Sequence, residues 1–122
     1  MKIGDQVDNG IYVGKINGHY IICSPIEYEL PFEVDWFQAN EYCKSIGMEL
    51  PSKEELNLLY ELRKLAPDYF PKREFHGYWP SSECTPKDAW AQFFFNGYQF
   101  EENKASNYHA RPIKRIKIDQ CH

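Results

Sequence analysis

The most informative segment of this sequence is Ala89-Trp90-Ala91-Gln92-Phe93-Phe94-Phe95-Asn96-Gly97-Tyr98-Gln99, which runs directly into Phe100. An Asn-Gly pair between two apolar runs predicts a β-hairpin with a two-residue type I′ turn, because both turn residues need positive φ. In that register Phe95 lies opposite Tyr98, and Phe93 lies opposite Phe100. Strand alternation then gathers these four rings on one face of the hairpin and places the other side chains on the opposite face: Trp90, Gln92, Phe94 and Gln99.

The hairpin pattern alone leaves open which face is buried. Aromatic side chains pair well across strands, and Gln92 and Gln99 are polar, so alternation by itself favours burial of the four rings. A resemblance carried by the residues around the hairpin implies the opposite arrangement.

A longer pattern of residues surrounds the hairpin. Tyr78-Trp79-Pro80-Ser81-Ser82-Glu83 precedes it, and Lys104 and the run Arg111-Pro112-Ile113-Lys114 follow it. Upstream, the same pattern includes the run from Leu50 to Tyr60 and four separate positions before it: Ala39, Tyr42, Cys43 and Gly47. Over about residues 34–115, the pattern resembles a family of small bacterial and phage domains. This family includes the C-terminal domains of collagen-like adhesins and is similar to the variable proteins of diversity-generating retroelements.

The resemblance implies a C-type-lectin-like fold of the formylglycine-generating-enzyme type, in which fixed scaffold positions alternate with changeable surface positions. It assigns Trp90, Gln92 and Phe94 to the buried scaffold. Carried across residue by residue, it also implies a binding surface made of the changeable positions: Ala91, Phe93, Phe95, Asn96, Tyr98, Phe100, Asn107 and His109. On this mapping the aromatic rings face outward. The chain departs from the family pattern at Pro80, Ala110 and Lys114.

The whole chain, residues 1–122, has the length of a single domain. A second hairpin is predicted around Asn17-Gly18. Apolar residues at helical spacing follow Asp35, a plausible N-cap, and end near Gly47. A capping box at residues 52–55 begins another helix, which stops before Pro67. Two hairpins, two helices and a loop-rich second half predict an α+β fold.

Composition excludes several classes of function. The formal net charge of −4 and a pI near 5.5 disfavour nucleic-acid binding, which needs clustered Lys and Arg. We find neither a membrane-spanning stretch nor an N-terminal signal peptide, so we expect a cytoplasmic protein. The four cysteines are far apart in sequence and are expected to be reduced thiols, although a spatial pairing of Cys84 with Cys121 stays open.

No enzyme class is favoured by the residues. The fold that the resemblance implies also occurs in oxidases that bind copper through paired thiols, but the nearest cysteines, Cys23 and Cys43, are widely separated. The chain has no Cys-x-x-Cys or His-x-x-x-His spacing for zinc, and residues 101–103 offer too few oxygen ligands for calcium. A Cys84–His109 nucleophile pair has little support. We therefore expect neither a metal nor a cofactor.

The sequence thus predicts a non-enzymatic protein-binding module with an aromatic β-rich face. The phage and prophage setting of small family members implies a host-protein inhibitor, with a defence protein as one target. Two alternatives stay open: a ligand-binding or sugar-binding lectin-like domain, and a homodimer closed through the aromatic face. Arg111 is expected to be structural, either paired with Glu83 or covering apolar surface with its stem.

Overall fold

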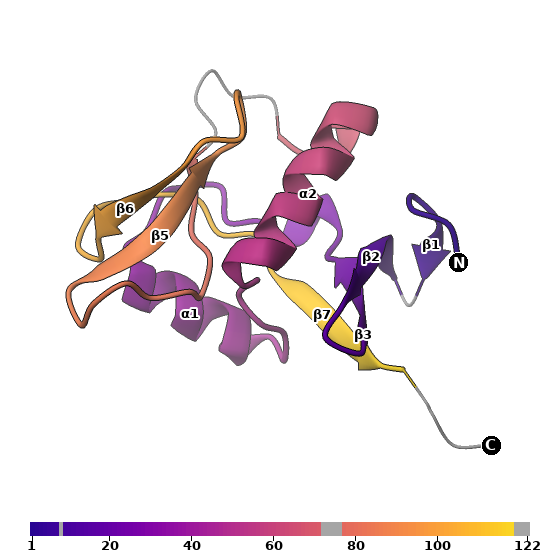
Figure 1. The fold of residues 1–122 in the computed structure, drawn as a ribbon, viewed down its shortest axis with the longest axis horizontal. Coiled ribbons are helices and arrows are strands. Elements are labelled where there is room, and N and C mark those ends of the chain that lie inside the picture. Colours follow the sequence, from indigo (N-terminus) through magenta and orange to yellow (C-terminus); the bar gives the residue numbers. More distant parts are fainter. Residues whose placement is uncertain (8, 72–76, 119–122) are drawn as a thin grey trace.

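The first and last strands of the described chain are the two edge strands of one antiparallel sheet (Figure 1). The computed structural model describes residues 1–7, 9–71 and 77–118. Its first sheet has the strand order β1-β2-β3-β7. The strands are β1 (Gln6–Val7), β2 (Gly10–Ile16), β3 (His19–Cys23) and β7 (Ile113–Lys117). Asn17 and Gly18 connect β2 to β3 with φ angles of 51° and 74°, so the predicted first hairpin is confirmed.

A second antiparallel sheet contains β4 (Gly77–Tyr78), β5 (Asp88–Phe93) and β6 (Gln99–Asn103) in that order. Figure 1 shows β5 and β6 at one end of the molecule and the first sheet at the other, with α2 (Lys53–Leu65) between them. The predicted α+β class is therefore confirmed at the level of two helices and two antiparallel sheets.

Both helices begin where the sequence predicts. Asp35 caps α1 (Trp36–Ser45) and Ser52 caps α2, and each N-cap forms a reciprocal capping box with the residue three positions on, Gln38 or Glu55. Gly47, with φ of 72°, follows the end of α1. Two short 3₁₀ helices, η1 (Ile26–Tyr28) and η2 (Pro67–Tyr69), complete the regular elements of the described residues.

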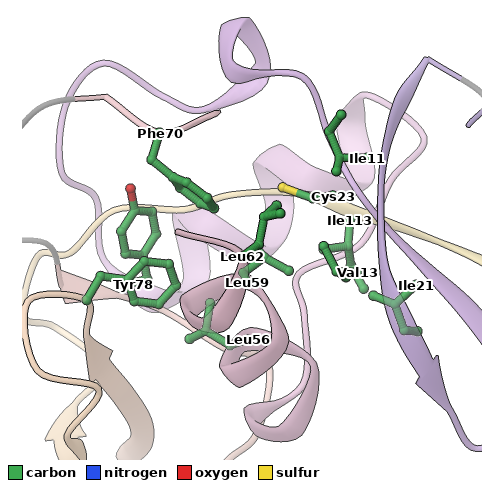
Figure 2. Packing of buried hydrophobic residues seen from close by; sticks show 11 residues of the cluster. Ile11, Val13, Ile21, Cys23, Leu56, Leu59, Leu62, Phe70, Tyr78 and Ile113 are labelled. Atoms are coloured by element: carbon green, nitrogen blue, oxygen red, sulfur yellow. The ribbon is translucent and has the colours of Figure 1, made fainter. Parts of the chain in front are cut away.

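The first core cluster lies between α2 and the first sheet. Leu56, Leu59 and Leu62 are fully buried and form one stripe of α2, because residues three apart share a helix face. Figure 2 shows Leu59 and Leu62 on the side of Val13 and Ile113 of the sheet and Leu56 nearer Tyr78. Each buried Leu side chain stabilises the folded state by about 1.5–3 kcal/mol, so the stripe contributes to holding α2 in the core.

The second core cluster joins α1 to the second sheet. Trp79 is completely buried at its centre, and its indole N–H donates to the Val34 carbonyl at 2.8 Å. Trp36 donates in the same way to the Pro80 carbonyl at 2.9 Å. Because both indole N–H groups are satisfied, these large rings can be buried without a desolvation penalty.

Arg111 is buried among backbone carbonyls and one carboxylate. Its Nη1 lies 3.0 Å from Glu29 Oε1, and both side chains are almost fully buried. Nε and Nη2 donate to the Ser24 carbonyl at 3.1 and 2.8 Å, and Nη2 also donates to the Tyr69 carbonyl at 2.8 Å. The guanidinium therefore connects β3, η1 and η2, which confirms a structural role for Arg111.

The expected Arg111–Glu83 pair is wrong. Glu83 Oε2 accepts from Lys104 Nζ at 2.6 Å, and its side chain is half exposed. Lys104 Nζ also lies 4.3 Å from the centre of the Trp36 ring. Buried Arg111 requires a carboxylate that is also buried, because an exposed one cannot compensate the loss of water around the guanidinium. Glu29 meets that requirement and Glu83 does not.

A second ion pair connects α2 to β7. Glu55 accepts from Nε and Nη2 of Arg115, each at 2.6 Å, and also from the Ser52 amide at 2.7 Å. Burial raises the pKa of Glu55, but the Arg115 and Ser52 hydrogen bonds outweigh burial, so the pKa is lowered overall. The carboxylate thus both caps α2 and holds it to the first sheet.

We expect Glu55→Gln to lower the free energy of unfolding at pH 7 by about 1.5–3 kcal/mol, the range for hydrogen bonds to charged groups. Since the folded-state pKa is depressed, this stability is present above the unfolded pKa and is lost as the pH falls through the folded one. Urea denaturation from pH 7 to acid measures it, with the exposed Glu54→Gln as the control. A Glu55→Gln protein with the parent's stability at pH 7 would contradict this role.

Neither helix of the described residues is both long enough and apolar enough to cross a membrane.

Candidate functional site

The β5–β6 hairpin carries the sequence-predicted site, but its register differs from the prediction. Gln92 pairs with Gln99 and Ala91 with Phe100. The Phe93 amide donates to the Tyr98 carbonyl at 2.9 Å, so the loop contains the four residues Phe94–Gly97 and not two. Phe93 therefore lies opposite Tyr98, and the expected Phe93–Phe100 and Phe95–Tyr98 pairs are wrong. Gly97 has positive φ, at 80°, and Asn96 does not, so the turn is not type I′.

Contacts with α2 hold this longer loop. The backbone of Gly97 lies against Tyr60, so closely that a Cβ there would be 2.5 Å from Tyr60 Cε2. The Gly97 amide donates to the Phe93 carbonyl at 2.8 Å. Arg63 Nη1 donates to the Phe94 carbonyl at 2.8 Å. The loop is thus anchored by a helix more than thirty residues away in sequence.

Phe94 points from the loop into the first core cluster. It is fully buried, and its ring lies 4.3 Å from Tyr78 and 5.7 Å from Phe70, centroid to centroid. Burying a phenylalanine in this way contributes about 1.5–3 kcal/mol. This burial outweighs the local preference of Asn-Gly for a tight turn.

One face of the hairpin changes from buried to exposed along its length. Ala89 and Ala91, in the middle of β5, are completely buried in the second core cluster. Phe93 and Phe100 are partly buried, whereas Tyr98 and Phe95, near the turn, are 61% and 49% exposed. The assignment of Ala91 to the binding surface is therefore wrong, because its methyl group packs in the core.

Four aromatic side chains form a continuous surface at the turn end of the hairpin: Phe93, Phe95, Tyr98 and Phe100. We call this the aromatic surface. Ring centroids of Phe93 lie 5.1 Å from Phe95 and 4.5 Å from Phe100, and the Tyr98 ring stacks on Phe100 at 5.8 Å. Such distances are those of interacting aromatic pairs. Each exposed ring is therefore held in place by a partly buried one.

Tyr108 supports the aromatic surface from below. Its ring lies 5.9 Å from Phe100 and 5.1 Å from the buried Trp79, and it fits against Gly77, where any Cβ would collide with it. Its hydroxyl donates to Glu102 Oε2 at 2.7 Å. This bond lowers the pKa of Glu102, whereas burial, assisted by the same bond, raises the pKa of Tyr108. A negative charge thus lies at the edge of the surface.

Sequence reasoning missed Tyr108 and Glu102. Tyr108 is placed by a β-bridge to Val34, with both backbone N–H groups donating across it at 2.8 and 2.9 Å. A contact between segments so far apart produces no periodic pattern in the sequence. A glycine can mark a position where another group packs closely against the backbone. At Gly77 that group is Tyr108, which the sequence does not reveal.

The opposite face of the hairpin packs on the start of α2. Gln92 is completely buried and donates to the Asn57 side chain at 2.9 Å and to the Gly97 carbonyl at 3.1 Å. Gln99 donates to the Lys53 carbonyl at 3.0 Å. Both side-chain amides therefore donate to backbone carbonyls inside the fold. Trp90 is only partly buried, contrary to expectation, and the Lys53 ammonium lies 3.7 Å from the centre of its ring.

The three remaining predicted site residues do not lie together on one surface. Asn96 is exposed in the loop, where its Oδ1 accepts from the Tyr98 amide at 2.9 Å. Asn107 is exposed beyond the hairpin. His109 is buried against the Tyr78 ring at 5.7 Å, so its assignment as a surface contact is wrong. The bridge of Tyr78 to residue 109 turns this side chain inward.

The cysteine side chains of the described residues are protonated thiols at neutral pH. Cys23, Cys43 and Cys84 are all unpaired by disulfides, and Cys121 lies outside the described residues. Burial raises the pKa of Cys23 and raises that of Cys43 to about 12. The pKa of Cys84 is also raised, chiefly by desolvation. A protonated thiol is a poor nucleophile and a poor metal ligand. The same residues contain no group of three or more His, Cys, Asp or Glu side chains that could hold a metal ion.

No protein-family model matches the chain, and no curated protein matches it significantly.

Proposed function

We propose that this protein is a non-enzymatic protein-binding module that captures a partner protein through the aromatic surface. The observation that carries the proposal is the exposure of Tyr98 and Phe95, at 61% and 49%, beside two partly buried rings. Aromatic residues are enriched in the buried centres of protein interfaces, where they supply much contact area at a low entropy cost. Rings already held by ring-to-ring contacts lose little further freedom on binding.

The architecture supports a finer proposal, that the domain has a C-type-lectin-like fold. The order of elements, a hairpin followed by two helices and a second small sheet, is the order that the family resemblance implies. The buried Gln92 and Phe94 and the partly buried Gln99 agree with its scaffold positions. By the same resemblance we extend the proposal to a phage or prophage protein that blocks a host protein.

The test is a pair of exposed substitutions, Phe95→Ser with Tyr98→Ser. A partner is first isolated from a bacterial lysate on the immobilised parent protein and purified, and its affinity for parent and variant is then measured. Removing interface anchors typically costs about 2 kcal/mol or more each, so we expect at least a thirtyfold loss of affinity. Each of these exposed side chains should cost no more than about 1 kcal/mol of stability when it is replaced, so the thermal midpoint should fall by about ten degrees at most.

The control for this test is Ile3→Ser, which removes an apolar side chain of similar exposure, 57%, from the N-terminal segment beside β1. It should bind the partner like the parent. Equal binding by the double variant would retire the proposal. Light scattering of the parent distinguishes the homodimer, since a dimer that the double variant converts to a monomer would mean that the surface is occupied by a second copy.

A further inference from the structure

A cleft of about 550 Å³ lies away from the aromatic surface. It opens between β1, η1 and η2, and Figure 1 shows β1 at the end of the molecule opposite β6. Small-molecule sites typically enclose roughly 300–1,000 Å³ and combine apolar walls with a few polar groups. The volume of this cleft falls within that range, so its lining decides what it could bind.

Apolar and polar side chains line the cleft in similar measure. Ile11 and Ser24 are buried members of the lining, and its partly buried apolar and aromatic members include Val7, Pro25 and Tyr69. These side chains would pack against a hydrocarbon or aromatic group and remove it from water.

Arg111 also lines the cleft, but its hydrogen-bond donors are already engaged within the protein and are poorly placed to bind an anion. Its Nη1 is paired with Glu29 at 3.0 Å, and its Nε and Nη2 donate to the carbonyls of Ser24 and Tyr69. The guanidinium is almost completely buried. A bound carboxylate or phosphate would therefore have to compete with contacts that hold the fold together.

The rim of the cleft is acidic. Glu27 and Asp68 both line it, and both residues are exposed. Within the described part of the chain, neither carboxylate takes part in an ion pair or accepts a hydrogen bond. Carboxylates carry a negative charge at neutral pH. Among the described residues, the cleft thus presents two unpaired carboxylates beside the apolar side chains of its lining.

We propose that this cleft binds a small organic cation, with an ammonium or guanidinium group at Glu27 and Asp68 and an apolar body against Val7, Pro25 and Tyr69. The inference follows from the combination of a cavity of ligand size, two carboxylates at its rim and an internally neutralised Arg111. The Tyr69 ring adds an aromatic surface on which a cation can be stabilised. It does not depend on the proposed protein-binding function.

Three probes of similar shape and different charge test the proposal. The ¹⁵N-labelled protein is titrated with 2-phenylethylammonium, with the neutral 2-phenylethanol and with the anionic 3-phenylpropanoate, and amide shifts are followed by NMR. We expect saturable shifts for the cation that are largest at Val7, Ser24 and Tyr69, and weaker or no saturation for the other two. Equal binding of the alcohol, preferred binding of the anion, or shifts centred elsewhere would overturn the proposal, as would the absence of saturation by the cation.

Isosteric neutral variants separate charge recognition from shape. Glu27→Gln with Asp68→Asn should weaken binding of the cation by about tenfold, the sum expected for two solvent-exposed ion pairs. Binding of the alcohol should be unchanged. The control is Glu41→Gln on α1, an exposed carboxylate that does not line the cleft. A double variant that binds the cation like the parent, or a control variant that loses binding equally, would contradict the assignment of these two carboxylates.

Discussion

Arg111→Met is expected to lower the free energy of unfolding by about 3–5 kcal/mol, the range for removing one partner of a buried ion pair. The substitution leaves Glu29 buried without this cation and leaves the Ser24 and Tyr69 carbonyls without their donor. Methionine fills much of the stem's volume, so the loss reports charge and hydrogen bonding more than packing. Urea denaturation monitored by tryptophan fluorescence measures it.

A double variant identifies the cause of that loss. Arg111→Met combined with Glu29→Leu removes both charges, and we expect it to be more stable than Arg111→Met alone, because no buried charge is left uncompensated. The exposed Lys117→Met serves as the control and should change stability by about 0.5 kcal/mol or less. An Arg111→Met protein within about 1 kcal/mol of the parent would mean that the buried pair contributes little.

Phe94→Ala and Phe95→Ala, at neighbouring positions of one loop, are expected to have very different effects on stability. Phe94 is fully buried against Tyr78 and Phe70, so its truncation should cost about 3–5 kcal/mol. Phe95 is 49% exposed, and its truncation should cost no more than about 1 kcal/mol, mainly from the lost contact with Phe93.

Thermal or urea denaturation of the two single variants decides this prediction. If Phe95→Ala were the more destabilising change, the loop would have the opposite side turned inward and the aromatic surface would be part of the core. Such a result would contradict both the hairpin register and the proposed binding surface. The comparison therefore tests the fold and the site with the same two proteins.

Local signals predicted most of the regular structure. The capping boxes at Asp35 and Ser52 and the positive-φ turn at Asn17-Gly18 all lie where they were expected. Each of these features is stabilised by groups within four residues of one another, so short sequence windows contain the information. The burial of Gln92 and Phe94 followed from the family resemblance and agrees with the structure.

The turn of the second hairpin shows where local reasoning stops. Asn17-Gly18 and Asn96-Gly97 are the same dipeptide, but only the first has positive φ at both residues. At the second, the packing of Tyr60 against Gly97 and the burial of Phe94 favour a longer loop. Tertiary contacts worth several kcal/mol thus override a turn preference.

Local sequence was enough to predict the two helices with their first residues and the two hairpins. Which hairpin residues are exposed, and which charged side chains pair, depends on contacts made only in the folded domain. Arg111 pairs with Glu29 and not with Glu83, and the buried Ala91 and His109 leave the surface to Phe93, Phe95, Tyr98 and Phe100. The physical reason is that a capping box or tight turn is stabilised by neighbours along the chain. The burial of a ring or an ion pair instead depends on segments that meet only when the whole domain has folded.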